Sequence, residues 1–462
     1  MEADATEVAV DATRAIPPIF GHSYPVVVRG EGSTVWDSAG RRYLDAMSGG
    51  SMAATLGHGR LDLVEAARHQ AATLSYIHNE RLTNPAQEAL ARELVTVAPE
   101  GFTRVRFATG GAEANETVIR LARAYHVERG EPTRWQVISQ AQAYHGPTME
   151  TLALTGRPGL HGPLSPYLAR HLHIPPSTRQ SDPSGEAALR ALDAALEEAG
   201  PGHVAAFFCE AISAAALPAH TPPQRFWEGL EERRREYGFL VCFDEVVTGM
   251  GRTGDWFAGC ATPIVPDLIA TAKGLGAGYA AIGAVLVHER VYDAFEARSR
   301  RFTLGHTWDG APLSCAVGLA VLEVLRSEGL VEHVRQRGER LRGQLEDALG
   351  DIPIVGEIRG HGFLLGVEYS HPADGISFLP PELGVAGRVD DAAMAHRVLI
   401  LSTQPTRDGY AGDQSLFAPP FTTSDETLEE MVGRFAEAVR GVSQEVESQL
   451  GASGRLASGI RR

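Results

Sequence analysis

The chain has 462 residues, 44% of them hydrophobic and 22% charged, and its formal net charge is −16. This length and composition are ordinary for a globular protein of about two domains, whereas the negative charge argues against a nucleic-acid backbone or an anionic membrane surface as a partner. No apolar stretch approaches the roughly 20 residues that span a bilayer, and the acidic first residues lack the pattern of a signal peptide.

The four cysteines lie far apart in the chain and form no CxxC pair (Cys209, Cys242, Cys260 and Cys315). Since three of them have apolar neighbours, they are interpreted as buried free thiols, not as metal ligands or disulfides. Free thiols are typical of a reducing compartment. We therefore expect a cytoplasmic protein without a metal site.

The N-terminal region alternates short β-like runs with glycine turns. The runs PVVV, STVW and RRYLDAM, between residues 25 and 47, predict a small antiparallel meander. Residues 48–59 (SGGSMAATLGHG) are too rich in glycine for regular structure and predict a flexible loop. Helical patterns follow over residues 61–74 and 85–97, and the second begins at Asn84-Pro85, a cap followed by a proline.

From about residue 104 the pattern changes to strands that alternate with helices. The expected strands are short apolar runs, and the helices between them carry one apolar face; the strands are RVRFA, WQVISQ, VAAFFCEAI, FLVCFDEVV, DLIATA and AIGAVLV. Such an order predicts a mostly parallel sheet covered by helices on both faces. A long helical region begins at Pro312 and continues to about Leu349.

The C-terminal part predicts a smaller α+β unit. Strands are expected within residues 352–369, 398–403 and 415–421, with a helix near 390–397. A capping box at residues 423–426 begins a last helix. The resulting division of the chain is an N-terminal part of a small domain (1–59), a large α/β domain (60–345), a C-terminal part of the small domain (346–450) and a flexible tail (451–462).

Lys273 is the only lysine in the chain, because the other 41 of the 42 basic residues are arginine. Arginine can replace lysine in surface charge and in phosphate or carboxylate contacts, but a guanidinium cannot form an imine with an aldehyde. A desolvated lysine amine can act as a nucleophile or a general base. The apolar run before Lys273 and the glycines after it fit that role, although one lysine retained by chance on a surface loop is the alternative.

Three further features favour a phosphorylated aldehyde cofactor. The turn TGGAE, residues 109–113, joins a strand to a helix N-terminus, where free N–H groups favour a phosphate; many ordinary turns share this pattern. Asp244 ends a buried strand and would need a cationic partner such as a protonated pyridine nitrogen, unless it caps the following turn. Tyr144 offers an aromatic face for stacking on a ring, unless it belongs to the core. Glu245, which follows Asp244 in the sequence, is assigned a structural pairing.

The ordered motifs GGAEANE, YHG, DEVVTGMGRTG, AKGLGAGY and GHTWDGAPLSCA resemble the class III pyridoxal-phosphate aminotransferases, the group of ornithine and ω-amino acid aminotransferases and glutamate-1-semialdehyde aminomutase. The resemblance runs from about Trp36 to Pro420. It implies the type I fold of pyridoxal-phosphate transferases, an α/β fold with a large domain around a mostly parallel sheet and a smaller α+β domain.

The resemblance also assigns roles to residues. It implies that Lys273 holds pyridoxal 5′-phosphate as a Schiff base and moves the proton during transfer. Asp244 would pair with the pyridine nitrogen, and Val246 would pack under the ring. Tyr144 would stack on the opposite face of the ring, with His145 beside it.

The phosphate contacts implied by the resemblance come from two subunits. Gly111 and Ala112 would bind the phosphate through backbone N–H groups. Thr307, in the GHTWDGAP turn, would bind the phosphate of the neighbouring subunit, which requires a homodimer with shared active sites. Read without the resemblance, this turn is a second anion site or an ordinary capped turn.

The sequence departs from the family pattern around the substrate. Glu210 is present and counted among the cofactor-site residues, but its surroundings read CEAISAAALPA instead of the usual Pro and Gln-Gly pattern. Leu416 and Phe417 stand near the position where many ω-amino-acid members have a carboxylate-binding arginine. Arg407, on an upstream loop, is either a mobile substitute or a solvated side chain.

We therefore expect a transaminase that moves an amino group from a donor amine or amino acid to a keto or aldehyde acceptor, by a ping-pong aldimine and ketimine route. An apolar pocket lining by Trp36, Met52, Phe417 and Phe421 would indicate a bulky substrate. The alternatives are an aminomutase, racemase or epimerase with the same cofactor, a nucleotide-binding protein that uses the TGGAE turn, and a non-catalytic pyridoxal-phosphate-binding scaffold.

Overall fold

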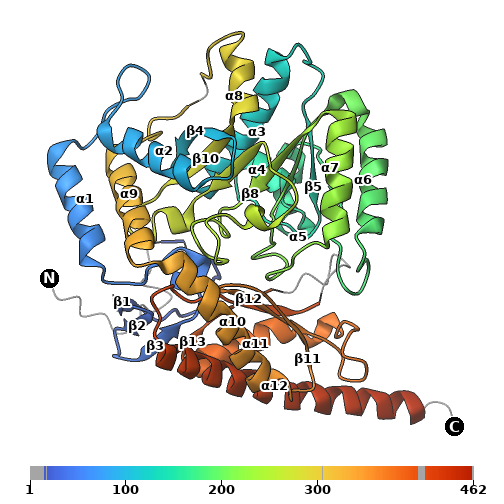
Figure 1. The fold of residues 1–462 in the computed structure, drawn as a ribbon. Coiled ribbons are helices and arrows are strands. Elements are labelled where there is room, and N and C mark those ends of the chain that lie inside the picture. Colours follow the sequence, from blue (N-terminus) through green and yellow to red (C-terminus); the bar gives the residue numbers. More distant parts are fainter. Residues whose placement is uncertain (1–14, 17, 304, 404–411, 460–462) are drawn as a thin grey trace.

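A seven-stranded sheet forms the centre of the computed structural model, which describes residues 15–16, 18–303, 305–403 and 412–459 (Figure 1). Its strands are β4 (Phe102–Ala108), β5 (Gln136–Gln140), β6 (Leu172–Ile174), β7 (Val204–Cys209), β8 (Leu240–Asp244), β9 (Leu268–Thr271) and β10 (Gly283–His288). The order across the sheet is β4-β10-β9-β8-β7-β5-β6, and β10 alone runs antiparallel to its neighbours. The predicted mostly parallel sheet is therefore confirmed.

Both faces of this sheet are covered, as the apolar strands require. Alternate residues of a strand pack in different cores. Phe207 of β7 and Phe243 of β8 pack in one cluster with helices α6 (Glu186–Ala199) and α7 (Gln224–Tyr237). Phe208 and Cys242 pack in the other cluster with α3 (Gly111–Glu128). The sheet is thereby the middle layer of a three-layer α/β unit. Short helices α4 (Met149–Leu154), α5 (Pro158–His161) and α8 (Glu289–Glu296) and strand β6 were not anticipated from the sequence.

Two four-stranded sheets stand beside the central one. The first joins the chain ends, because β1 (Val27–Glu31), β2 (Thr34–Asp37) and β3 (Arg42–Asp45) form the predicted meander and β13 (Val398–Leu399) pairs in parallel with β3. The second contains β11 (Val355–His361), β12 (Leu364–Tyr369), β15 (Gln414–Phe417) and β14 (Leu401–Thr403), all antiparallel. No helix in the described ranges is long and apolar enough to cross a membrane.

The remaining helices enclose these sheets: α1 (Leu61–Thr73), α2 (Pro85–Val97), α9 (Pro312–Ser327), α10 (Leu330–Leu349), α11 (Val385–Ala395) and α12 (Asp425–Gly459). Helix α2 begins as predicted, since the Asn84 side chain accepts from the Gln87 amide at 2.9 Å. Helix α12 extends along the sheets of the chain ends and packs against α10 and α11 (Figure 1). It is helical to Gly459, so the backbone of residues 451–459 is not the irregular tail we expected; the segment lacks proline, which would end a helix.

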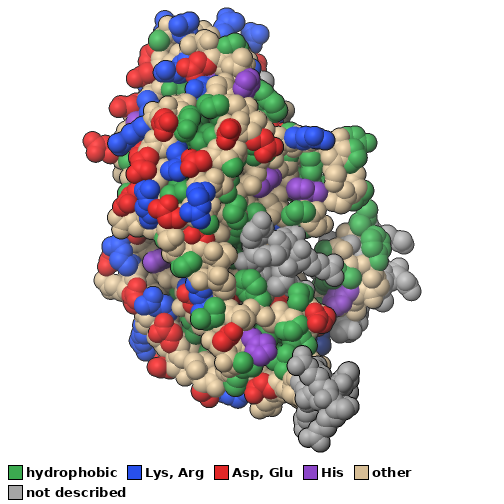
Figure 2. Space-filling model, turned by 90° about the vertical axis from the view of Figure 1, so that its right-hand side faces the viewer, with side chains coloured by type: hydrophobic (Ala, Val, Ile, Leu, Met, Phe, Trp, Pro, Cys, Tyr) green, Lys and Arg blue, Asp and Glu red, His purple; other side chains and the backbone are tan. Residues whose placement is uncertain are grey.

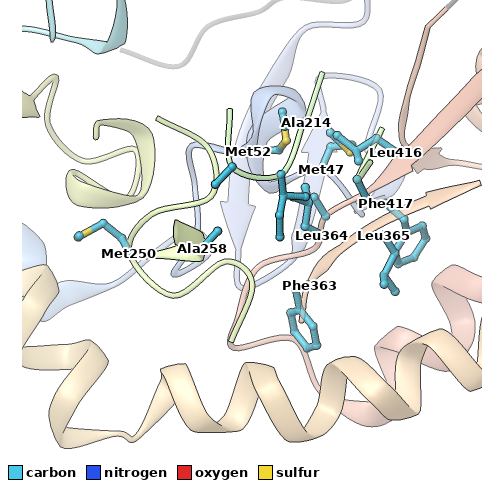
Figure 3. Packing of buried hydrophobic residues seen from close by; sticks show 14 of the residues in the cluster. Met47, Met52, Ala214, Met250, Ala258, Phe363, Leu364, Leu365, Leu416 and Phe417 are labelled. Carbon is cyan, nitrogen blue, oxygen red and sulfur yellow. The ribbon is translucent and has the colours of Figure 1, made fainter. Parts of the chain in front are cut away.

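The glycine-rich segment 48–59 is anchored by its few larger side chains, which the prediction of a flexible loop did not anticipate. Met52 and Leu56 are 1% exposed and belong to the main core, in the same cluster as Phe417 and Leu416 (Figure 3). The Ser48 hydroxyl donates to the Ala418 carbonyl at 2.8 Å. Packing and this hydrogen bond hold a backbone that has no regular pattern of its own, with φ angles of 82° at Gly49 and 80° at Gly50.

Arg252 joins three segments that are distant in the sequence. Its guanidinium is fully buried and donates to the carbonyls of Phe363 (3.1 Å) and Pro419 (2.6 Å) and to the hydroxyl of Ser48 (2.9 Å). Burial lowers the pKa of Arg252 to about 9, an effect opposed by Asp45. This side chain thus connects the loop after β8 with both four-stranded sheets.

On the surface, positive and negative side chains are interspersed over the face shown in Figure 2. Three of the predicted thiols are buried as expected, but Cys260 is exposed. It lies in a short 3₁₀ helix, Ala258–Ala261, of which only Ala258 and Gly259 are buried.

Candidate active site

Five of the predicted site residues stand where neighbouring strands of the central sheet end. Gly111 follows β4, Tyr144 follows β5, Glu210 follows β7, Asp244 ends β8 and Lys273 follows β9. Because the carboxyl ends of parallel strands meet at one edge of a sheet, these residues come together in space. They line a single cavity of about 360 Å³.

The amine of Lys273 is placed for nucleophilic chemistry. Burial lowers its pKa, while the carboxylates of Asp244 and Glu210 act in the opposite direction and Arg252 adds a smaller lowering effect. The backbone at Lys273 has a φ of 34°, in the region that non-glycine residues rarely adopt. Its carbonyl accepts hydrogen bonds from the Gly276 and Ala277 amides, which hold this conformation. A larger neutral fraction of the amine favours attack on a carbonyl.

Asp244 is a buried carboxylate with three hydrogen-bond donors. Its Oδ2 accepts from Asn115 Nδ2 at 2.7 Å and from His145 Nδ1 at 2.8 Å, and its Oδ1 accepts from the Val246 amide at 3.0 Å. Because a carboxylate only accepts, Nδ1 of His145 carries the proton. Nε2 of His145 lies 3.2 Å from the hydroxyl of Ser139. The contacts fix the carboxylate and offset the cost of burying it.

The start of helix α3 is an anion site by its geometry. The first N–H groups of the helix have no acceptor within it, and Thr109, Gly110, Gly111 and Ala112 all line the cavity. A Cβ atom on Gly111 would lie 2.7 Å from Cγ1 of Val246, so only glycine allows this close approach. These backbone amides and the positive helix end suit a phosphate.

The YHG turn brings an aromatic ring to the same cavity. Tyr144 is 38% exposed and lines the cavity together with His145 and Gly146. Gly146 has a φ of 138°, and a Cβ atom there would lie 2.7 Å from Oγ1 of Thr151. Glycine is therefore required for the turn to pack closely beside α4. Burial, followed by the charge of Asp244, raises the pKa of Tyr144.

Glu210 is the second carboxylate of the cavity and is only 7% exposed. Its Oε1 accepts from the Ala214 amide at 3.1 Å and its Oε2 accepts from the Ser213 hydroxyl at 3.2 Å. Burial raises the pKa of Glu210 to about 7; His145 opposes this shift and Asp244 adds to it. Glu210 can therefore change its charge near neutral pH.

Thr307 is the one proposed cofactor residue that does not line this cavity. It is exposed and borders a separate depression with His78, Asn79 and Arg106. The other predicted residues, including Ala112 and Val246, do line the cavity. Arg407 lies outside the described residues.

The predicted apolar pocket lining is wrong for the cavity of this chain. Met52, Phe417 and Phe421 are at most 1% exposed and pack in the core; Figure 3 shows the first two. Trp36 lies under the guanidinium of Arg29 at 3.8 Å. None of the four lines the cavity, whose lining residues include several alanines instead. Periodicity identified these residues as apolar but could not separate core packing from a cavity wall.

One functional feature escaped sequence reasoning. Asn115 donates to both Asp244 and the His145 carbonyl (2.8 Å); an asparagine inside an amphipathic helix, where its propensity is low, was the available signal. Glu245 does not line the cavity. Its carboxylate accepts from the amides of Ala258 and Gly259, as the structural pairing expected from the sequence requires.

A phosphorylated aldehyde with a pyridine ring fits this set of groups. Lys273 offers the amine, Asp244 a carboxylate, and the glycine start of α3 an anion site, all around one cavity. Gly111 allows Val246 to approach the start of α3 closely, and the backbone N–H groups at this helix start suit a phosphate.

The chain is similar to known aminotransferases over most of its length. Residues 20–439 match the sequence model of the class-III aminotransferase family. A probable aminotransferase of Mycobacterium tuberculosis is 39% identical over 355 residues, which are 75% of this chain and 76% of that protein. An (S)-enantioselective ω-transaminase from Thermomicrobium roseum has a TM-score of 0.86 at 31% identity, over 93% of this chain and 97% of that one. For the PMP-bound aminotransferase from Vibrio fluvialis the TM-score is 0.83 at 27% identity, over 92% and 94%.

Proposed function

This chain belongs to the class III aminotransferases and is therefore a pyridoxal-phosphate-dependent transaminase of fold type I, and from this premise we propose that Lys273 carries the cofactor. The supporting observation is that the only lysine of the chain lines the same cavity as Asp244 and the glycine start of α3. No other side chain of the 462 residues can form an imine with an aldehyde through an ε-amine.

The other residues would hold the cofactor in a fixed orientation. Backbone amides of Gly111 and Ala112 bind the phosphate, and the Asp244 carboxylate pairs with the ring nitrogen. Tyr144 and Val246 cover the two faces of the ring. When bound, the cofactor supplies a carbonyl carbon that takes up the donor's amino group and a protonated ring that accepts electrons.

Lys273 would also move the proton. As a free neutral amine, its Nζ would take a proton from the carbon that bears the donor nitrogen, and the lowered pKa of Lys273 increases the neutral fraction of this amine. Asn115, His145 and the Val246 amide keep the Asp244 carboxylate in place during the reaction.

Hydride reduction tests this assignment. Protein incubated with pyridoxal phosphate, reduced with borohydride and digested should carry the cofactor mass on the Lys273 peptide alone, and the Lys273→Ala variant should carry none. In turnover, the keto product should equal the amine consumed. Labelling of a different peptide would refute the Lys273 assignment, and amine rearrangement without keto product would indicate an aminomutase or racemase.

We further propose a cytoplasmic homodimer in which Thr307 serves the neighbouring subunit. Thr307 is exposed and stands beside Trp308, which is 55% exposed and contacts Tyr76 edge-on at 5.4 Å. A large exposed aromatic ring next to a phosphate-binding hydroxyl is expected where a second copy covers the surface. The division into a large domain (60–345) and a small domain from both chain ends also remains a proposal.

A further inference from the structure

The cavity around Lys273 contains a carboxylate that no described cation neutralises. Among the described residues that line it, Lys273 is the only cation, and Glu210 and Asp244 are the acidic side chains. Glu210 is bonded to two neutral donors, the Ser213 hydroxyl and the Ala214 amide. No described arginine or histidine lies within ion-pair distance of it, and an acidic side chain buried in this way is costly when charged and unpaired.

Binding of the cofactor would leave Glu210 as the one acidic group available to a substrate. The proposed function commits Lys273 to the cofactor's carbonyl carbon and Asp244 to its ring nitrogen. The other titratable side chains that line the cavity are Tyr144 and His145, and the proton on His145 Nδ1 is directed to Asp244. The charge that Glu210 can form therefore has no protein partner among the described lining residues.

Several of the side chains that line the same cavity are apolar. Ala53, Ala215, Ala281 and Ile282 line the cavity together with Pro147. Such walls favour a methylene chain and offer no side-chain donor for a substrate carboxylate. The net charge of −16 also attracts cations to the protein and repels anions.

We propose that the preferred amino donor is an aliphatic diamine, whose distal ammonium group pairs with Glu210 while its other amine reacts at the Lys273 end of the cavity. This inference rests on the proposed function. The free-energy cost of keeping the Glu210 charge away from water is offset when an ammonium group makes a direct hydrogen bond to the carboxylate. Glu210 is thus a specificity-determining residue: an alkyl end leaves it unpaired, and a carboxylate end is repelled by it.

Matched donors test the proposal on the holoenzyme. 1,5-Diaminopentane, pentylamine and 6-aminohexanoate share a five-carbon amine chain. Its last carbon carries an ammonium group in the first, only hydrogen in the second and a carboxylate in the third. The rate constant for loss of the cofactor's absorbance band, divided by donor concentration, should be at least about tenfold higher for the diamine than for pentylamine and lowest for the amino acid. The four- and six-carbon diamines, each with its monoamine, cover the choice of chain length.

Two variants isolate the charge. Glu210→Gln should bring the ratio of the diamine rate constant to the monoamine rate constant close to one, because a neutral amide cannot form an ion pair with an ammonium group. Ser213→Ala is the matched control: it removes a neutral donor to Glu210 and keeps the carboxylate, so the preference should remain. Retention of the full preference in Glu210→Gln overturns the inference.

Infrared difference spectra give a readout that does not depend on turnover. At pH 6 the protonated carboxyl band of Glu210, identified by its loss in Glu210→Gln, should disappear on addition of diamine and persist with pentylamine. If every amine discharges the absorbance band at similar rates and the carboxyl band does not respond, the inference fails while the proposed function stands. If no amine discharges the band, the proposed function and the inference fail together.

Discussion

Replacement of Asn115 tests whether the buried network around Asp244 stabilises the fold. Asn115 is 1% exposed, and its Nδ2 donates to Asp244 Oδ2 at 2.7 Å and to the His145 carbonyl at 2.8 Å. A hydrogen bond to a charged group contributes roughly 1.5–3 kcal/mol and one to a neutral carbonyl about 1 kcal/mol. Asn115→Leu loses both hydrogen bonds. The loss is partly offset because the substitution also removes the buried Oδ1, which has no hydrogen-bond partner, and adds apolar contacts. We expect a net loss of about 1–2 kcal/mol.

The matched variant Asn115→Asp keeps the size of the side chain and adds a charge beside Asp244. Two carboxylates within hydrogen-bond distance repel each other in a site that excludes water. We expect a loss of about 3–5 kcal/mol at pH 8. The pKa of one of the two carboxyl groups would be raised in the folded state, so this loss should shrink as the pH falls toward 5.

Urea unfolding of the cofactor-free protein, followed by circular dichroism, measures both variants against the original chain. Comparable slopes of free energy with urea concentration are required for the comparison, because unequal slopes would mean that the unfolding reaction itself had changed. The reasoning would be refuted if Asn115→Leu were as stable as the original chain, or if Asn115→Asp were the more stable of the two variants at pH 8.

Three further outcomes are expected. Mixed dimers of a Lys273→Ala subunit with a Thr307→Ala subunit should regain activity that neither homodimer has, because one of the two sites then holds both native residues. If the co-purified mixed dimers regain no activity, Thr307 belongs to its own chain's site or to no site. Burial raises the pKa of Glu210 from 4.5 to about 7. The resulting contribution to the free energy of unfolding, on the order of 3 kcal/mol, should be present below pH 4.5 and lost as the pH rises through 7. Glu210→Gln should flatten this part of the stability profile of the cofactor-free protein. Arg252→Met should cost about 3–5 kcal/mol of stability, measured by denaturant unfolding, since the Phe363 and Pro419 carbonyls and the Ser48 hydroxyl lose their donor.

Much of the fold was predictable because local signals agree with tertiary burial. The strand that ends at Asp244 is apolar on both faces, and Phe243 and Cys242 do pack into opposite cores. Asn84-Pro85 marked a helix start that the structure contains. Short elements such as β6 (Leu172–Ile174) have too few residues for a periodic pattern and depend on the neighbouring strand for their hydrogen bonds.

The candidate site was predictable where chemistry restricts the residue type. A single lysine among arginines, a carboxylate at the end of a buried strand and a glycine turn are each visible in the sequence, and Lys273, Asp244 and Gly111 do line one cavity. The substrate side was not predictable. Phe417 and Met52 are core residues, and Ala53 and Ala215 form cavity walls, because strand pairing and the packing of residues 48–59 determine which apolar side chains face the cavity.

The absence of lysine outside the cavity gives the protein an unusual chemical property. Apart from the α-amino group at the beginning of the chain, Nζ of Lys273 is the one primary amine that an acylating dye or an amine-directed cross-linker can modify. Modification located on the Lys273 peptide would therefore report on the accessibility of this one side-chain amine, and attachment to an amine-reactive support would have almost no other side-chain anchoring point. Surface lysines could then be introduced singly, each as a unique position for a label or a tether.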